Sequence, residues 1–73
     1  MEQFIATLTI DEYRAFARRC IGECNVSRAA WSYWRRGLAT PIAKYRQTIN
    51  RIALEMFGRT VFATGAAEEG GGR

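Results

Sequence analysis

Apolar residues recur at spacings of three and four along most of this chain, the pattern of helices that bury one face. A short stripe within residues 1–8 consists of Met1, Phe4, Ile5 and Leu8. A longer stripe over residues 10–24 consists of Ile10, Tyr13, Phe16, Ala17, Cys20, Ile21 and Cys24. Thr9 precedes the longer stripe and Glu12 follows three residues later, which is the spacing of a capping box. The pattern predicts two helices, although the first is brief and uncapped, so a frayed terminus is its alternative.

A tight turn is predicted after the second stripe. Asn25 tolerates the left-handed conformation that ends many helices, and Ser27 is suited to cap the next helix. Trp31 and Trp34 lie three residues apart and give this helix an apolar face, while arginine, alanine and serine occupy much of its remaining circumference. The order is therefore helix, tight turn, helix, with the second helix at about residues 27–36.

A last helix is predicted to begin at Thr40-Pro41, because threonine caps helices and proline fits the first helical position. Its apolar positions are Ile42, Tyr45, Ile49, Ile52, Ala53 and Met56. The polar positions, expected to face elsewhere, are Lys44, Arg46, Gln47, Asn50 and Arg51. Gly58 is expected to end the helix.

The end of the chain changes in composition. Residues 60–63 are expected to fold back on the core as a short extended piece. Residues 64–73 are Gly-rich and lack large apolar groups, so a disordered tail is expected. A chain of 73 residues supports one core, hence one domain over residues 1–63. The predicted fold class is all-α, a small helix-turn-helix bundle of about four helices.

Positive charge is concentrated in the middle of the chain. The net charge is +4, and residues 28–59 carry seven Lys and Arg side chains against Glu55 alone. Such a basic region suits a polyanion such as nucleic acid. The alternative is a solvated basic face that has no partner.

Several function classes are disfavoured by composition. The chain has no histidine, so the usual general base is missing and no enzyme activity is expected. Cys20 and Cys24 are too few for a zinc site and badly placed for a disulfide, so reduced core groups are expected. We expect no metal, no cofactor and no small-molecule ligand. No apolar run approaches the ~20 residues of a membrane span, and no signal peptide is evident, so a cytoplasmic protein without a membrane partner is expected.

The segment "NVSRAAWSYWRRG" followed by "ATPIAKYRQTINRIA" resembles the phage-repressor and Cro-type helix-turn-helix domains. More loosely, it resembles small prophage or mobile-element proteins. In the repressor family a "GVSR" turn opens the recognition helix, and a Pro-started helix follows a short loop. The resemblance covers residues 10–57, with Asn25 in place of the usual glycine and Ile21 in place of a small alanine. It implies a lambda-repressor-like fold and binding of double-stranded DNA in transcription regulation.

Carried over position by position, the resemblance also implies site residues. Ser27 matches the cap that touches phosphate, and Lys44 matches a phosphate contact on the following helix. The remaining matches are groove-facing positions and the end of the recognition helix, namely Arg28, Ala29, Ser32, Tyr33 and Arg36. Trp31 and Trp34 are expected to anchor the core. For Tyr33 the alternative is a place at the core rim.

Two other functions remain as alternatives for the same fold. One is a protein-interaction adaptor or inhibitor module, and the other is RNA binding through the basic face. For a DNA binder we expect a homodimer, because one module reads few base pairs. Its interface is expected at Phe4-Ile5-Leu8 or at Val61-Phe62.

Overall fold

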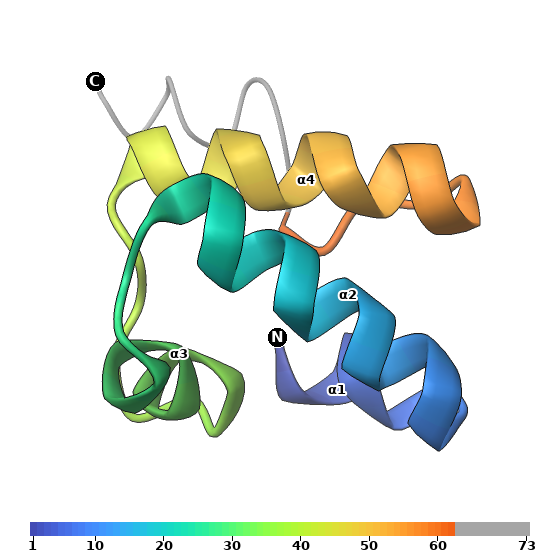
Figure 1. Ribbon diagram of the computed structural model, residues 1–73, viewed down its shortest axis with the longest axis horizontal. Helices are drawn as coiled ribbons and strands as arrows, with labels where there is room; N and C mark the ends of the chain where they lie inside the picture. The colour runs from blue at the N-terminus through green and yellow to red at the C-terminus, as the bar shows by residue number, and fades with distance from the viewer. Residues whose placement is uncertain (63–73) are drawn as a thin grey trace.

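The computed structural model describes residues 1–62, and the predicted tail at 64–73 lies outside them, as does Ala63. The helices of the described part are α1 (Glu2–Ala6), α2 (Ile10–Cys24), α3 (Arg28–Arg35) and α4 (Ala43–Phe57). In Figure 1, α2 and α4 run across the view next to each other, whereas α3 is seen almost end-on. The predicted all-α bundle of about four helices is confirmed.

Local capping signals define both ends of α2 and the beginning of α3. Thr9 and Glu12 form the predicted capping box, in which the Thr9 hydroxyl accepts from the Glu12 amide at 3.1 Å and the Glu12 carboxylate accepts from the Thr9 amide at 2.9 Å. Asn25 ends α2 in the left-handed conformation, with φ 56° and ψ 49°. The Ser27 hydroxyl accepts from the Ala30 amide at 3.0 Å and caps α3.

The short connection between α2 and α3 determines how α3 is displayed. Only residues 25–27 separate the two helices, so the chain turns sharply and α3 crosses α2 steeply (Figure 1). At the other end, Gly37 adopts a φ of 77°, which a residue with a side chain rarely does, and α3 stops there. As a result α3 projects from the layer formed by α2 and α4.

The predicted beginning of α4 is wrong. The helix begins at Ala43 with Ile42 as its N-cap, and no side chain caps it. Pro41 lies before the helix, where it is buried and its carbonyl accepts from Arg46 Nη1 at 2.6 Å. Burial of the ring and this arginine contact hold Pro41 outside the helix, so Thr40 has no capping role. The predicted end at Gly58 is confirmed, with φ 74°.

The core is built around aromatic side chains from all four helices and the residues that flank them. Its buried members are Phe4, Phe16, Cys20, Cys24, Trp31, Ile49, Ile52 and Ala53. The Phe16 ring lies 5.6 Å from that of Phe4, 5.7 Å from that of Phe57 and 6.0 Å from that of Trp31, between centroids. Ile10 is an exception to the predicted stripe, because it is 69% exposed at the first position of α2.

A second exception is Asn50, which was expected to face away from the core. Its side chain is 8% exposed. Its Oδ1 accepts from the amides of Val61 and Phe62, both at 2.9 Å, and its Nδ2 donates to the Phe62 carbonyl at 3.1 Å. These bonds hold Val61 and Phe62 against the core, so the predicted return of the segment is confirmed for these two residues, although they lie in bends and not in an extended piece. An amide side chain is suited to this place because it both accepts from and donates to the backbone.

Candidate nucleic-acid interface

One face of α3 anchors the helix through aromatic contacts. Trp31 is 3% exposed and packs against Phe16. Trp34 is half-buried and lies 6.5 Å from Trp31 and 5.4 Å from Tyr45, between ring centroids. The expected anchoring role of Trp31 is confirmed, and Trp34 extends the aromatic contacts to α4. Because the anchor occupies one side of α3, the rest of its circumference is left for polar residues.

Two polar stripes cover the remainder of α3. Ala29, Tyr33 and Arg36 lie at i, i+4 and i+7 and are all exposed, Tyr33 by 54%. Arg28, Ser32 and Arg35 lie at the same spacing, one residue earlier in each case. The first stripe faces outward, and the second lines a cleft between α3 and α2.

The cleft between α2 and α3 has a volume of about 470 Å³. Its walls carry four arginines, Arg14 and Arg18 from α2 and Arg28 and Arg35 from α3. The other lining residues are Tyr13, Ala17, Ile21, Trp31 and Ser32. No carboxylate lines this cleft among the residues that the structure describes. The cleft therefore concentrates positive charge that its own walls do not neutralise.

The four arginine side chains of the cleft are not paired with a carboxylate of the described residues. Within residues 1–62, none of them forms a hydrogen bond or an ion pair, and the same holds for Arg36. Arg35 in particular forms no ion pair with a glutamate of the described residues. The carboxylates of Glu23 and Glu55 are occupied by other arginines.

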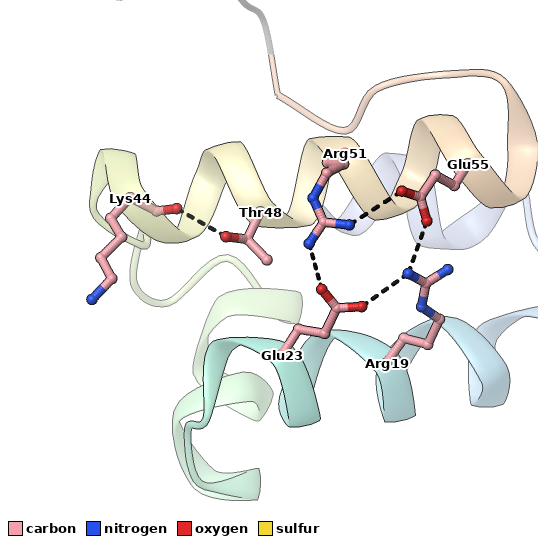
Figure 2. A network of polar contacts seen from close by, with 6 residues as sticks. All are labelled: Arg19, Glu23, Lys44, Thr48, Arg51 and Glu55. Atoms are coloured by element: carbon pink, nitrogen blue, oxygen red, sulfur yellow. Dashed lines mark hydrogen bonds and ion pairs between the residues drawn. The ribbon is translucent and has the colours of Figure 1, made fainter.

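Figure 2 shows how those carboxylates are used, in a closed ring that joins α2 to α4. Arg19 Nη2 donates to Glu23 at 2.9 Å and to Glu55 at 2.8 Å. Arg51 donates to Glu55 at 3.2 Å through Nη1 and to the second oxygen of Glu23 through Nη2. The guanidinium groups lower the pKa of both carboxyls, with Arg51 the main cause at Glu23 and Arg19 the main cause at Glu55.

The ring and the cleft use different faces of α2. Arg14, Arg18 and Ile21 share the cleft face at i, i+4 and i+7, whereas Arg19 and Glu23 face α4. The carboxylates of Glu23 and Glu55 are thus paired with arginines on the side of α2 that faces α4. The side of α3 keeps an uncompensated basic surface, which is the charge pattern of a polyanion-binding face.

The residues predicted for DNA contact fall into three places. Arg28 and Ser32 lie together in the cleft. The outward stripe and the capping position hold the exposed residues Ser27, Ala29, Tyr33 and Arg36. Lys44 lies apart from them at the second position of α4, with its Nζ 5.6 Å from the centroid of the Tyr45 ring, and Figure 2 shows its side chain extending away from the ion-pair ring.

Three arginines of the cleft were not predicted as site residues. They are Arg14 and Arg18 on α2 and Arg35 on α3. The sequence did indicate that two of them share a face, because Arg14, Arg18 and Ile21 recur at helical intervals on α2. Only the position of α3 shows that this face meets a second arginine stripe.

The two cysteines contribute to packing. Both are buried and free, and burial raises the pKa of the Cys20 thiol to about 12 and also raises that of Cys24. Protonated thiols of this kind are poor nucleophiles and poor metal ligands. Among residues 1–62, no group of three or more His, Cys, Asp or Glu side chains is placed to hold a metal ion. None of the four helices is long and apolar enough to cross a membrane.

The site is interpreted from this geometry alone. Comparison with protein-family models, with curated proteins and with solved structures found no match to this chain. The features of the site are the projecting helix α3, the arginines around it and a cleft whose described lining contains no carboxylate.

Proposed function

We propose that this domain binds double-stranded DNA through α3, as a small cytoplasmic transcriptional regulator of a bacterium or phage. The observation that carries the proposal is a set of arginines without an ion-pair partner in residues 1–62, on and beside a helix that projects from the domain, namely Arg14, Arg18, Arg28, Arg35 and Arg36. Arginine offers a planar fork of donors to phosphates and to guanine edges. The resemblance of residues 10–57 to phage-repressor domains supports the same function.

In this proposal α3 enters the major groove, which is wide enough for one helix. Arg28 lies at the N-terminal end of α3, where side chains reach base edges in such complexes. Tyr33 and Arg36 follow on the outward stripe. Arg14 and Arg18 project from the neighbouring helix, where backbone phosphates pass. Lys44 contributes a phosphate contact from α4.

A protein partner is the second candidate, and an exposed apolar patch favours it. Tyr33, Leu38 and Ile42 are exposed around the connection from α3 to α4. The amide of Leu38 donates to the Tyr33 carbonyl at 2.9 Å, which holds the connection beside α3. We propose a second copy of this chain as the partner, because the same apolar surface on two copies can pair about a two-fold axis without any DNA. Phe4, considered above for a dimer interface, is instead buried in the core.

The experiment compares two variants that each lose one positive charge. The duplex is first selected from a random pool, and each variant is then titrated against it and its single-base changes at several salt concentrations. Arg28→Ala should lose about 1–3 kcal/mol of discrimination at one base position and keep nonspecific binding. Lys44→Ala should weaken all duplexes alike and reduce the salt slope by roughly one.

Two results would contradict the proposal. If Arg28→Ala weakens every sequence equally, α3 does not read bases in the proposed way. If the wild-type protein binds no duplex at low salt, the DNA function is wrong and the protein-partner function replaces it. Circular dichroism of both variants provides the folding control, since both side chains are exposed and lie outside the core.

A further inference from the structure

A polarised hydroxyl group lies in the cleft between α2 and α3. Trp31 Nε1 donates a hydrogen bond to the Tyr13 hydroxyl oxygen at 3.0 Å, and both residues line the cleft. Because this oxygen accepts from the indole, its own proton is left to donate, and no acceptor for it lies within residues 1–62. A hydroxyl that accepts one hydrogen bond becomes a stronger donor in another. Tyr13 is half-buried and lines the cleft, so its hydroxyl is available to a ligand bound there.

The charged groups of the cleft come from two helices. Arg14 and Arg18 are one turn apart on α2, and Arg28 and Arg35 are about two turns apart on α3. Ser32 lies between the latter two and is half-buried, which adds a second hydroxyl donor. The polar side-chain groups of the lining are thus four guanidinium groups, two hydroxyls and an indole N–H that is already bonded. A donor set without a carboxylate is suited to a ligand that only accepts hydrogen bonds.

We propose that this cleft binds a free oligophosphate, meaning two or three phosphate groups joined by anhydride bonds, alone or as part of a nucleotide. One guanidinium group can donate to two phosphate oxygens at once. The four guanidinium groups of the cleft match the charge of a triphosphate better than that of a single phosphate. A volume of about 470 Å³ falls within the ~300–1,000 Å³ of typical small-ligand sites. A duplex backbone spreads its charges along its length, whereas this half-enclosed cleft favours a ligand with concentrated charge.

The ligand site goes beyond the proposed DNA function and shares residues with it. Arg28 and Ser32 line the cleft and were also expected to face the groove. An oligophosphate in the cleft therefore occupies donors that α3 needs for DNA. The bound oligophosphate would also contact both α2 and α3, and so would restrain the orientation of α3 relative to α2. Oligophosphate and duplex accordingly compete for the protein.

The first test is an NMR titration of the wild-type protein with sodium triphosphate. The indole Nε1–H resonance of Trp31 should shift at a stoichiometry of one triphosphate per chain, because its acceptor Tyr13 contacts the ligand. Trp34 does not line the cleft and provides an internal control whose indole resonance should stay in place. Tyr13→Phe should weaken binding by about tenfold through loss of one hydrogen bond to a charged group. Equal shifts of both indoles, or none, would overturn the site.

A charge-matched pair of variants separates a built site from diffuse attraction. Arg18→Gln removes a cleft guanidinium, and Arg36→Gln removes an exposed one outside the cleft. Arg18→Gln should weaken triphosphate binding by about tenfold. Arg36→Gln should weaken it by less than about twofold, because Arg36 lies outside the cleft and acts on the ligand only through a screened, longer-range charge. Equal losses would show general charge attraction and overturn the inference. Both substitutions are on helix surfaces, so the comparison holds even if Tyr13→Phe fails to fold.

A competition experiment with the selected duplex distinguishes the ligand site from the DNA function. Triphosphate should displace the selected duplex from the wild-type protein, and Tyr13→Phe, at a cleft residue with no proposed duplex contact, should raise the concentration required. If triphosphate moves the Trp31 indole but no duplex binds, the ligand site stands and the DNA function falls. If duplex binds but triphosphate leaves the Trp31 indole unmoved, the ligand site alone falls.

Discussion

Replacement of Asn50 by alanine is expected to release the C-terminal segment from α4. The Asn50 side chain accepts from the amides of Val61 and Phe62 and donates to the Phe62 carbonyl, at distances of 2.9 to 3.1 Å. It is also the one polar residue buried in the described part of the chain. Three backbone groups of the segment therefore depend on a single side chain.

The magnitude follows from these three bonds. Each hydrogen bond contributes about 1 kcal/mol net, so their loss amounts to about 3 kcal/mol if the segment stays in place. If the segment detaches, water satisfies its backbone, but the half-buried Val61 and Phe62 then lose apolar contacts worth on the order of 1 kcal/mol each. Either route lowers the free energy of unfolding by about 2–3 kcal/mol, against the 5–15 kcal/mol typical of small domains.

Urea unfolding measures this loss, and amide hydrogen exchange at Val61 and Phe62 locates it. Gln47→Ala is the matched control, because Gln47 is an exposed amide on the same helix, and its replacement should change stability by less than about 0.5 kcal/mol. The reasoning is refuted if Asn50→Ala unfolds at the same urea concentration as Gln47→Ala. It is equally refuted if the two amides stay as protected as in the wild type.

Two further predictions concern α2. Gly22→Ala should raise stability by about 0.5–1 kcal/mol, because Gly22 is exposed within the helix and no atom lies within 4 Å of an added Cβ; a thermal midpoint that stays the same or falls would contradict this. The lowered pKa of Glu23, caused first by Arg51 and then by Arg19, makes the ring stabilising above the usual glutamate pKa of about 4.3. That contribution should be lost as the pH falls through the lowered folded-state value, so urea midpoints from pH 7 to pH 3 should fall less steeply for Glu23→Gln than for the wild type. Parallel slopes would show that the ring is not linked to folding.

Helix ends were predictable from sequence where the signal is local. Thr9 with Glu12, Asn25, Ser27 and Gly58 each act on backbone groups a few residues away, so their types and spacing suffice. The beginning of α4 was not predictable in this way. Arg46 donates to the Pro41 carbonyl and keeps Pro41 before the helix, and the capping residue types at Thr40-Pro41 do not indicate this contact. The Arg46–Pro41 contact joins residues only five apart, but it depends on the placement of a long side chain and not on capping residue types.

The burial and the site roles of several polar residues could not be predicted from sequence either. Asn50 is indistinguishable by type from the exposed polar positions of its helix, and its bonding partners lie 11 and 12 residues later. Arg14 and Arg18 have a readable helical spacing, but the cleft they line exists only once α3 has crossed α2. The expectation that α3 carries an aromatic anchor and a polar remainder required only its own residues, and the structure confirms the anchor at Trp31.

Different residues of α3 attach the helix to the core and form its exposed surface, and this separation has an evolutionary consequence. Its attachment depends on Trp31 and Trp34, which face the core and Tyr45, while Ala29, Tyr33 and Arg36 are exposed on the outward stripe. Exposed positions of this kind tolerate substitution with little change in stability. Descendants of this chain can therefore diverge at the three outward positions while the tryptophan pair is retained. The exposed chemistry of α3 and its attachment to the core are encoded by separate residues, so the first can change while the second is kept.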